Sequence, residues 1–88
     1  MFPFSEKQIN EVDFIRRFSL DLDDEDLYWH KDAEDRVISK ISGENWLYQE
    51  DNCLPIPIGD DDIFINKNTW HRIIKGSSDL IIKVSKLK

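Results

Sequence analysis

From Leu27 onward the chain consists of short runs rich in β-branched and aromatic residues, and each run ends at residues that favour turns. Glycines such as Gly43 and Gly76 separate the runs, together with clusters of asparagine, aspartate and serine, because these residues adopt turn conformations at little cost. Pro55 and Pro57 indicate a sheet edge or a loop, since proline cannot donate a hydrogen bond to a neighbouring strand. Several short strands at regular spacing favour a small all-β sandwich or barrel. We predict strands over residues 27–31, 36–41, 45–49, 63–65, 69–75 and 79–86.

The N-terminal part of the chain has a different pattern. Ser5 and Gln8 have the spacing of a capping box at the start of a helix. Apolar residues then follow at helical spacing up to Ile15. We therefore predict a short helix over residues 5–16. Residues 18–22 alternate between apolar and polar, which is the period of an extended strand.

The only two histidines of the chain, His30 and His71, each follow a tryptophan directly. Side chains of a regular strand alternate between its two faces, so His30 and Asp32 share one face and Trp29 lies on the other. In the same way, His71 and Trp70 point in opposite directions. If the histidines face the interior, His30, Asp32 and His71 converge on one pocket as two imidazoles and a carboxylate, a set that binds divalent transition metals. If the tryptophans face the interior, the histidines lie at the surface, and the sequence leaves both arrangements open.

The charges of the chain are spread unevenly. Residues 1–62 carry 17 acidic and 6 basic side chains, and residues 63–88 carry 1 acidic and 6 basic ones, for a formal net charge of -6. An acidic protein is repelled by the phosphate backbone of nucleic acids, so we expect no bulk DNA or RNA as a partner. The basic C-terminal part is able to hold a small anion, or to attract the acidic part within the fold or within a dimer.

The sequence also predicts where the protein acts. No apolar run approaches the roughly 20 residues of a membrane-spanning helix, and the N-terminal residues lack the basic start and apolar stretch of a signal peptide. Cys53 is the only cysteine, so no internal disulfide can form. We therefore expect one domain over residues 1–88 in a reducing cytoplasm, with no membrane partner.

Residues 27–85 resemble the cupin family in their order of strands, polar residues and glycines. The first cupin motif runs His-x-His, then three or four residues, Glu, six residues and Gly. When its glycine is placed on Gly43, its two histidines fall on His30 and Asp32, and its glutamate falls on Arg36. The order of the motif is thus retained, while two of its metal-binding positions are changed.

The second cupin motif, Gly followed by Pro-x-Gly and a histidine, matches the order Gly59, Asn66, Asn68 and His71. Asn68 stands in for the second glycine, a reasonable exchange because asparagine tolerates a positive φ angle better than most residues. The chain is also similar to small single-domain cupins that bacteriophages often encode, and a phage-encoded chain would act in the cytoplasm of its host. Segments that recur there match Trp29, His30, Lys31, Asp32, Asp35, Arg36, Gly43, Trp46, Gln49, Leu54, Pro55, His71, Arg72 and Gly76.

The resemblance implies a cupin-like jelly-roll barrel over residues 27–86 and a homodimer. It also implies a metal site in which His30, Asp32 and His71 hold a divalent ion such as Fe, Mn, Ni or Zn. Arg36 would be repelled by this ion unless it pairs with a carboxylate or binds an anionic ligand. If Arg36 paired with Asp32, we would expect the metal to lose its carboxylate ligand.

Three classes of function fit these residues. The first is a metal-dependent enzyme, such as an oxygenase or an isomerase, in which the ion keeps open positions for its substrate. The second is a metal-free module that binds an anionic small molecule such as a nucleotide or a sugar phosphate, and the third is a non-catalytic dimeric interaction protein. We predict a small ligand in the barrel mouth, contacted by Arg36, Trp46, Gln49 and Arg72.

Overall fold

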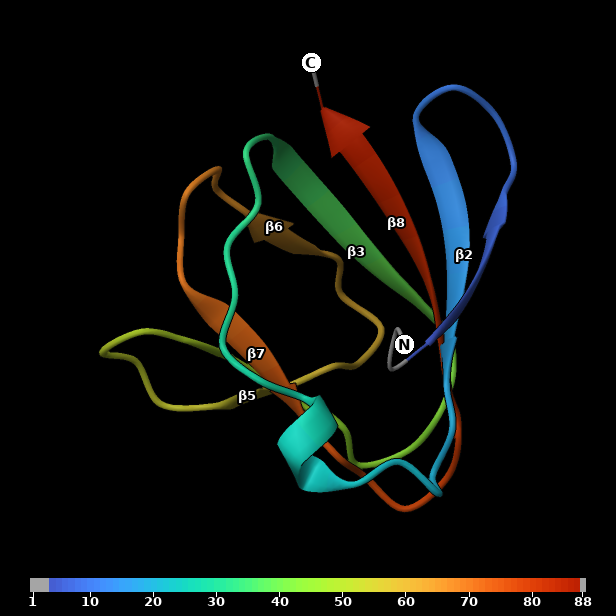
Figure 1. Cartoon of the computed structure of the whole chain (residues 1–88), viewed down its shortest axis with the longest axis vertical. Coiled ribbons are helices and arrows are strands. Elements are labelled where there is room, and N and C mark those ends of the chain that lie inside the picture. Colours follow the sequence, from blue (N-terminus) through green and yellow to red (C-terminus); the bar gives the residue numbers. More distant parts are fainter. Residues whose placement is uncertain (1–3, 88) are drawn as a thin grey trace.

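Two antiparallel β-sheets face each other in the computed structural model, which describes residues 4–87 (Figure 1). The larger sheet has five strands in the order β1-β2-β8-β3-β6, and the smaller sheet has three in the order β5-β4-β7. No described strand pairs with both sheets, so the expected closed barrel is corrected to a sandwich, while the all-β prediction is confirmed. The strands are β1 (Ser5–Gln8), β2 (Asp13–Phe18), β3 (Asp35–Ser42), β4 (Leu47–Glu50), β5 (Ile56–Pro57), β6 (Ile63–Ile65), β7 (His71–Ile74) and β8 (Leu80–Leu87).

Strand β8 lies at the centre of the larger sheet, between β2 and β3. Its side chains alternate, so Leu80, Ile82 and Val84 are buried while the residues between them are only partly covered. The neighbouring strand β2 follows the same rule and buries Phe14 and Phe18 on the same inner face. This alternation is the period of a half-buried strand, and it makes the inner face of the larger sheet one wall of the core.

The smaller sheet and the segments beside it supply the opposite wall of the core. Tyr48 on β4 and Trp46 just before it are both buried. The indole Nε1 of Trp46 donates a hydrogen bond to the carbonyl oxygen of Ser78 at 2.6 Å, which satisfies its only polar atom. Strand β5 lies at the edge of this sheet, as the prolines Pro55 and Pro57 predicted.

Residues 5–16 form part of a β-hairpin, so the predicted helix is wrong. Strand β1 pairs with β2, and β2 pairs along its length with β8. In the turn between β1 and β2, the side-chain Oδ1 of Asn10 accepts hydrogen bonds from the N–H groups of Val12 and Asp13, both at 2.9 Å, and so closes the turn. Pairing with β8 buries Phe14, and this long-range gain outweighs the local helical spacing of the apolar residues. No helix within residues 4–87 is long and apolar enough to cross a membrane.

The predicted strand over residues 27–31 is reduced to a single bridge between His30 and His71. Directly before this segment lies η1 (Asp24–Asp26), a short 3₁₀ turn at one end of the sandwich (Figure 1). Leu27 after this turn is buried in the core. Of the other predicted strands, residues 63–65 have the predicted bounds and the rest are confirmed with shifted ends. The extended segment expected over residues 18–22 is wrong beyond Phe18, where the chain turns.

Two turn positions need special backbone angles. Gly43 has a φ of 127°, and a Cβ atom at this position would lie 2.9 Å from the carbonyl oxygen of Asp79 and 3.0 Å from the Cα of Leu80. Only glycine therefore fits there without displacing backbone atoms. Asn68 has a φ of 60°, which confirms the expectation that it replaces a glycine in a left-handed conformation.

Candidate metal centre

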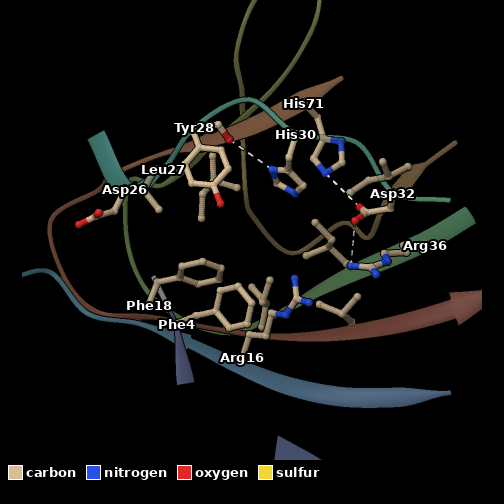
Figure 2. A pocket seen from close by; sticks show the side chains of 15 residues that line it. Phe4, Arg16, Phe18, Asp26, Leu27, Tyr28, His30, Asp32, Arg36 and His71 are labelled. Atoms are coloured by element: carbon tan, nitrogen blue, oxygen red, sulfur yellow. Dashed lines mark hydrogen bonds and ion pairs between the residues drawn. The ribbon is translucent and has the colours of Figure 1, made fainter. Parts of the chain in front are cut away.

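A cavity of about 230 Å³ lies between the two sheets (Figure 2). Its polar lining includes His30, Asp32 and His71 on the side of the smaller sheet, and Arg16 and Arg36 on strands of the larger sheet. The sheets thus bring together residues that are far apart in the sequence. The other lining residues are Phe4, Phe18, Asp26, Leu27, Tyr28, Ile38, Ile65, Ile73, Ile82 and Val84.

The two histidines are joined through their backbones. The N–H of His30 donates to the carbonyl oxygen of His71 at 3.0 Å, and the N–H of His71 donates to the carbonyl oxygen of His30 at 2.9 Å. This exchange sets the residues directly opposite each other, and their ring centroids lie 4.3 Å apart. Only 4% of His71 is exposed, whereas 46% of Trp70 is exposed. The histidines therefore face the interior and the tryptophans face outward, which decides between the two arrangements left open by the sequence.

Both imidazole rings are oriented by a nearby backbone carbonyl. The Nδ1 of His71 lies 2.7 Å from the carbonyl oxygen of Thr69, and the Nδ1 of His30 lies 3.3 Å from that of Tyr28. A ring nitrogen this close to a carbonyl oxygen carries the proton, because the oxygen can only accept. The other nitrogen, Nε2, then keeps its lone pair, which is the state needed to bind a metal ion.

His71 is held in its neutral form. Burial lowers the pKa of its imidazole below the usual value, and the nearby His30 lowers it further. The hydrogen bond to Thr69 and the charge of Asp32 act in the opposite direction, but the effect of burial is larger. A neutral imidazole is a ready metal ligand, since no proton has to leave Nε2 before binding.

Asp32 has one carboxylate oxygen without a partner. Its Oδ2 is buried and accepts no hydrogen bond within the part of the chain that the structure describes. This atom lies 3.5 Å from the Nε2 of His71. The other oxygen, Oδ1, lies 3.4 Å from the Nη1 of Arg36. The carboxylate therefore meets the arginine with one oxygen and keeps the other directed at the histidines (Figure 2).

Arg36 contacts two carboxylates, which would offset its repulsion by a metal ion bound nearby. Its Nε and Nη2 donate to Glu34 Oε1 at 3.0 and 2.7 Å, and its Nη1 faces Asp32. We expected a pairing of Arg36 with Asp32 to cost the metal its carboxylate. The structure shows this pairing, but through Oδ1 alone, and Oδ2 has no hydrogen-bond partner within residues 4–87.

The donor set fits a divalent transition metal. One ligand atom each from His30, Asp32 and His71 all lie within 4.8 Å of one another. Atoms bound to one ion at about 2.0–2.2 Å lie roughly 3–3.5 Å apart, so the side chains need to close by about an ångström. His30 is only half-buried, whereas His71 is buried. Two imidazoles and a carboxylate suit Fe, Mn, Ni or Zn.

Three of the four predicted ligand contacts lie away from this cavity, and only Arg36 lines it. Trp46 is part of the core. Arg72 is the neighbour of His71 on β7 and so points to the opposite, outer face, where its Nε donates to Gln49 Oε1 at 2.9 Å. The structure therefore does not bring Arg36, Trp46, Gln49 and Arg72 to one cavity, because Gln49 and Arg72 face outward on β4 and β7 and Trp46 is buried in the core. Their role in ligand binding stays a prediction.

Arg16 also lines the cavity, although it is not among the site residues expected from the sequence. A helix over residues 5–16 would have no relation to the histidines. In the observed strand, Phe14, Arg16 and Phe18 alternate with outward-facing residues and share the inner face of β2. The sequence of β2, Asp-Phe-Ile-Arg-Arg-Phe, does not alternate between polar and apolar residues, so no local pattern identified Arg16 as an inward-facing residue.

The fold is similar to that of a solved protein, NMB1881 from Neisseria meningitidis, with a TM-score of 0.67. The similarity covers 96% of this chain and 84% of that chain, at 14% sequence identity. No family model and no curated protein sequence matches. Likeness at this identity concerns the fold alone, so membership of the cupin family stays a prediction. The chain therefore shares the fold of a small Neisseria protein over nearly its whole length.

Proposed function

We propose that this protein binds a divalent transition-metal ion through His30, Asp32 and His71, and that the cavity beside the ion receives a small molecule. One observation carries the proposal: three potential ligand atoms lie within 4.8 Å of one another, and the Oδ2 of Asp32, 3.5 Å from the Nε2 of His71, is buried without a hydrogen-bond donor from residues 4–87. Leaving such an oxygen unpaired is costly, and an ion would satisfy it.

The cavity would determine what the ion can do. Three protein ligands leave further coordination positions open for water or a small molecule. When bound, an ion of this kind polarises the group that it contacts. The enzymatic versions expected from the cupin resemblance, an oxygenase or an isomerase, would use these open positions.

A metal-free site for an anionic small molecule is the second candidate. The contact of Arg36 with Asp32 favours it, because a cation already offsets the carboxylate charge. However, Arg36 also gives its Nε and Nη2 to Glu34, which leaves few donors for a ligand. We therefore place the metal site first. The homodimer and the cytoplasmic location remain predictions.

Elemental analysis of the natively purified, untagged protein tests the proposal. We expect near-stoichiometric Fe, Mn, Ni or Zn in the wild type, and none in a folded His30→Ala/His71→Ala double variant. If the wild type held no metal even after reconstitution with each ion, the proposal would be wrong.

A matched pair of carboxylate variants sharpens this test. Asp32→Asn and Asp35→Asn each remove one negative charge, but only Asp32 lines the cavity. Asp35 accepts a hydrogen bond from the Lys67 N–H at 2.7 Å, which an asparagine oxygen can also accept. Asp32→Asn should lose the metal and Asp35→Asn should retain it. Equal metal content in both variants would count against Asp32 as a ligand.

A further inference from the structure

Arg16 directs a charged group into the cavity from the side opposite the histidines (Figure 2). Its side chain is only 17% exposed, and its Nε donates to Glu6 Oε1 at 2.8 Å. The terminal nitrogens Nη1 and Nη2 have no acceptor within residues 4–87. Burial lowers the pKa of this guanidinium, yet an arginine stays charged in proteins. The cavity therefore contains a cation with unused hydrogen-bond donors.

A second guanidinium increases the need for an anion. Arg36 lines the same cavity, and its charge disfavours the charged form of Arg16. Arg36 is paired with two carboxylates, Glu34 and Asp32. Within residues 4–87, Arg16 has one carboxylate partner, Glu6, and its Cζ lies 4.1 and 4.7 Å from the ring centroids of Phe4 and Phe14, which carry no charge. A negatively charged group placed against the free edge of Arg16 would satisfy its donors and offset this repulsion.

The rest of the cavity has room for an apolar group. A cavity of about 150 Å³ is enough to hold benzene, and this cavity measures about 230 Å³. Phe18, Leu27 and Ile73 supply apolar surface to its walls. Tyr28 also lines it and is 65% exposed, so the cavity reaches solvent beside this residue.

We propose that the cavity binds a small carboxylic acid with a ring-sized apolar body, whose carboxylate accepts hydrogen bonds from Nη1 and Nη2 of Arg16. The apolar body lies against Phe18, Leu27 and Ile73. The inference rests on the proposed metal site in one respect: the carboxylate on Arg16 faces the ion held by the histidines. A guanidinium edge matches the two oxygens of a carboxylate in a bidentate arrangement.

A carboxylate fits this position better than a phosphate monoester. Glu6 already lies against the Nε of Arg16, and Asp32 lines the same cavity. A phosphate monoester carries nearly two negative charges at pH 7, so its second charge would be repelled by these two carboxylates. A carboxylate brings one charge, which the free edge of Arg16 neutralises.

Isothermal titration with benzoate tests the inference on the full chain, in metal-loaded and in chelator-treated form. Benzoate should bind, and three comparison compounds should bind more weakly. Benzyl alcohol has the ring but no charge, acetate has the charge but no ring, and phenyl phosphate has a second negative charge. Arg16→Gln should raise the Kd for benzoate about tenfold or more, the usual effect of losing a charge-assisted hydrogen bond. Equal binding of benzyl alcohol, or stronger binding of phenyl phosphate, would overturn the inference.

Arg17→Gln is the matched control. Arg17 is the next residue on β2, its side chain is 60% exposed, and it pairs with Asp79 at 2.6 Å on the outer side. The Kd of the Arg17→Gln variant for benzoate should equal that of the wild type. If Arg16→Gln and Arg17→Gln weakened benzoate binding equally, the role of Arg16 would be overturned. If Arg16→Gln does not fold, Arg16→Lys keeps the charge without the bidentate edge, and unchanged affinity in that variant would also contradict the inference.

The metal content of the same samples separates the two proposals. If the protein holds no metal but binds benzoate through Arg16, the metal proposal fails and the acid site stands. If the protein holds metal but binds benzoate equally with and without Arg16, the acid site fails and the metal proposal stands.

Discussion

The paired segments around His30 and His71 present two different faces. On the inner face, the imidazoles and the Asp32 carboxylate are partly or fully buried, and one carboxylate oxygen has no hydrogen-bond donor among the described residues, 4–87. On the outer face, the Cζ of Arg72 lies 4.8 Å from the ring centroid of Trp29.

The residues of the outer face satisfy one another or are solvated. The Nζ of Lys31 lies 5.2 Å from the ring centroid of Trp70, and Trp70 is 46% exposed. Water reaches these groups, and a cation over an exposed aromatic ring is worth only about 0.5–1 kcal/mol. On the inner face, the Oδ2 of Asp32 is itself buried and has no hydrogen-bond partner within residues 4–87, so a bound group is needed to satisfy it. The need for a ligand therefore arises on the inner face, although the outer face also carries charged residues, Lys31 and Arg72.

The largest expected difference between interior and exterior concerns two tryptophans. Trp46→Ala should lower the free energy of unfolding by about 3–5 kcal/mol, because Trp46 is 1% exposed and its loss leaves a large cavity. Trp70→Ala should lower it by about 1 kcal/mol or less, since mainly the contact with Lys31 is lost. Urea denaturation followed by circular dichroism measures both. Similar losses in the two variants would show that the outer face contributes more than solvated contacts.

Metal-dependent stability gives the next largest effect. At a free metal concentration of 100 times Kd, binding to the native state should stabilise the wild type by about 2.7 kcal/mol. For a domain of this size, this corresponds to a rise in Tm of roughly 10–20 °C. His71→Ala should abolish the rise, whereas Trp70→Ala, which changes the neighbouring residue on the outer face, should retain it. A scan of Tm against metal concentration measures this, and a rise that persists in His71→Ala would exclude His71 as a ligand.

The smallest effect is the pH dependence of the metal-free protein. Burial lowers the pKa of His71 in the folded state, so the unfolded state binds more protons just below its own pKa of about 6.5. The free energy of unfolding should therefore fall as the pH drops below about 6.5, with a slope of at most about 1.4 kcal/mol per pH unit from this residue. Above that pH, the contribution of His71 is fully present.

Urea denaturation between pH 7.5 and 5, with a chelator present, measures this slope. His71→Gln should have a shallower slope in the same window, because glutamine does not titrate. A slope that is unchanged in His71→Gln would assign the pH dependence to other groups.

Several parts of the fold could be predicted from local patterns. The alternation of β8 and the turn residues around it placed a strand over residues 79–86, and the paired prolines marked the edge strand β5. Asn68 was expected where a positive φ is needed, and it has one. Each of these features depends on neighbours in the chain, which is why sequence reasoning was sufficient.

Other parts depended on contacts between distant segments. The capping pattern at Ser5 and Gln8 is compatible with a helix, but pairing of β2 with β8 made this region a hairpin. The closed barrel was replaced by a sandwich because no described strand pairs with both sheets. The grouping of Gln49 and Arg72 with Arg36 failed because strand alternation turns the first two outward, away from the cavity.

The sequence by itself determined that His30 and Asp32 lie on one side of the chain and Trp29 on the other, because alternation is a property of the extended backbone. Only the tertiary structure decided which side is covered, since that depends on where the second sheet packs. It also brought Arg16 from the N-terminal hairpin and Arg36 from β3 to the same cavity. The candidate metal ligands therefore come from two short segments, around His30 and around His71. They form a site only because the two sheets pack against each other and enclose them.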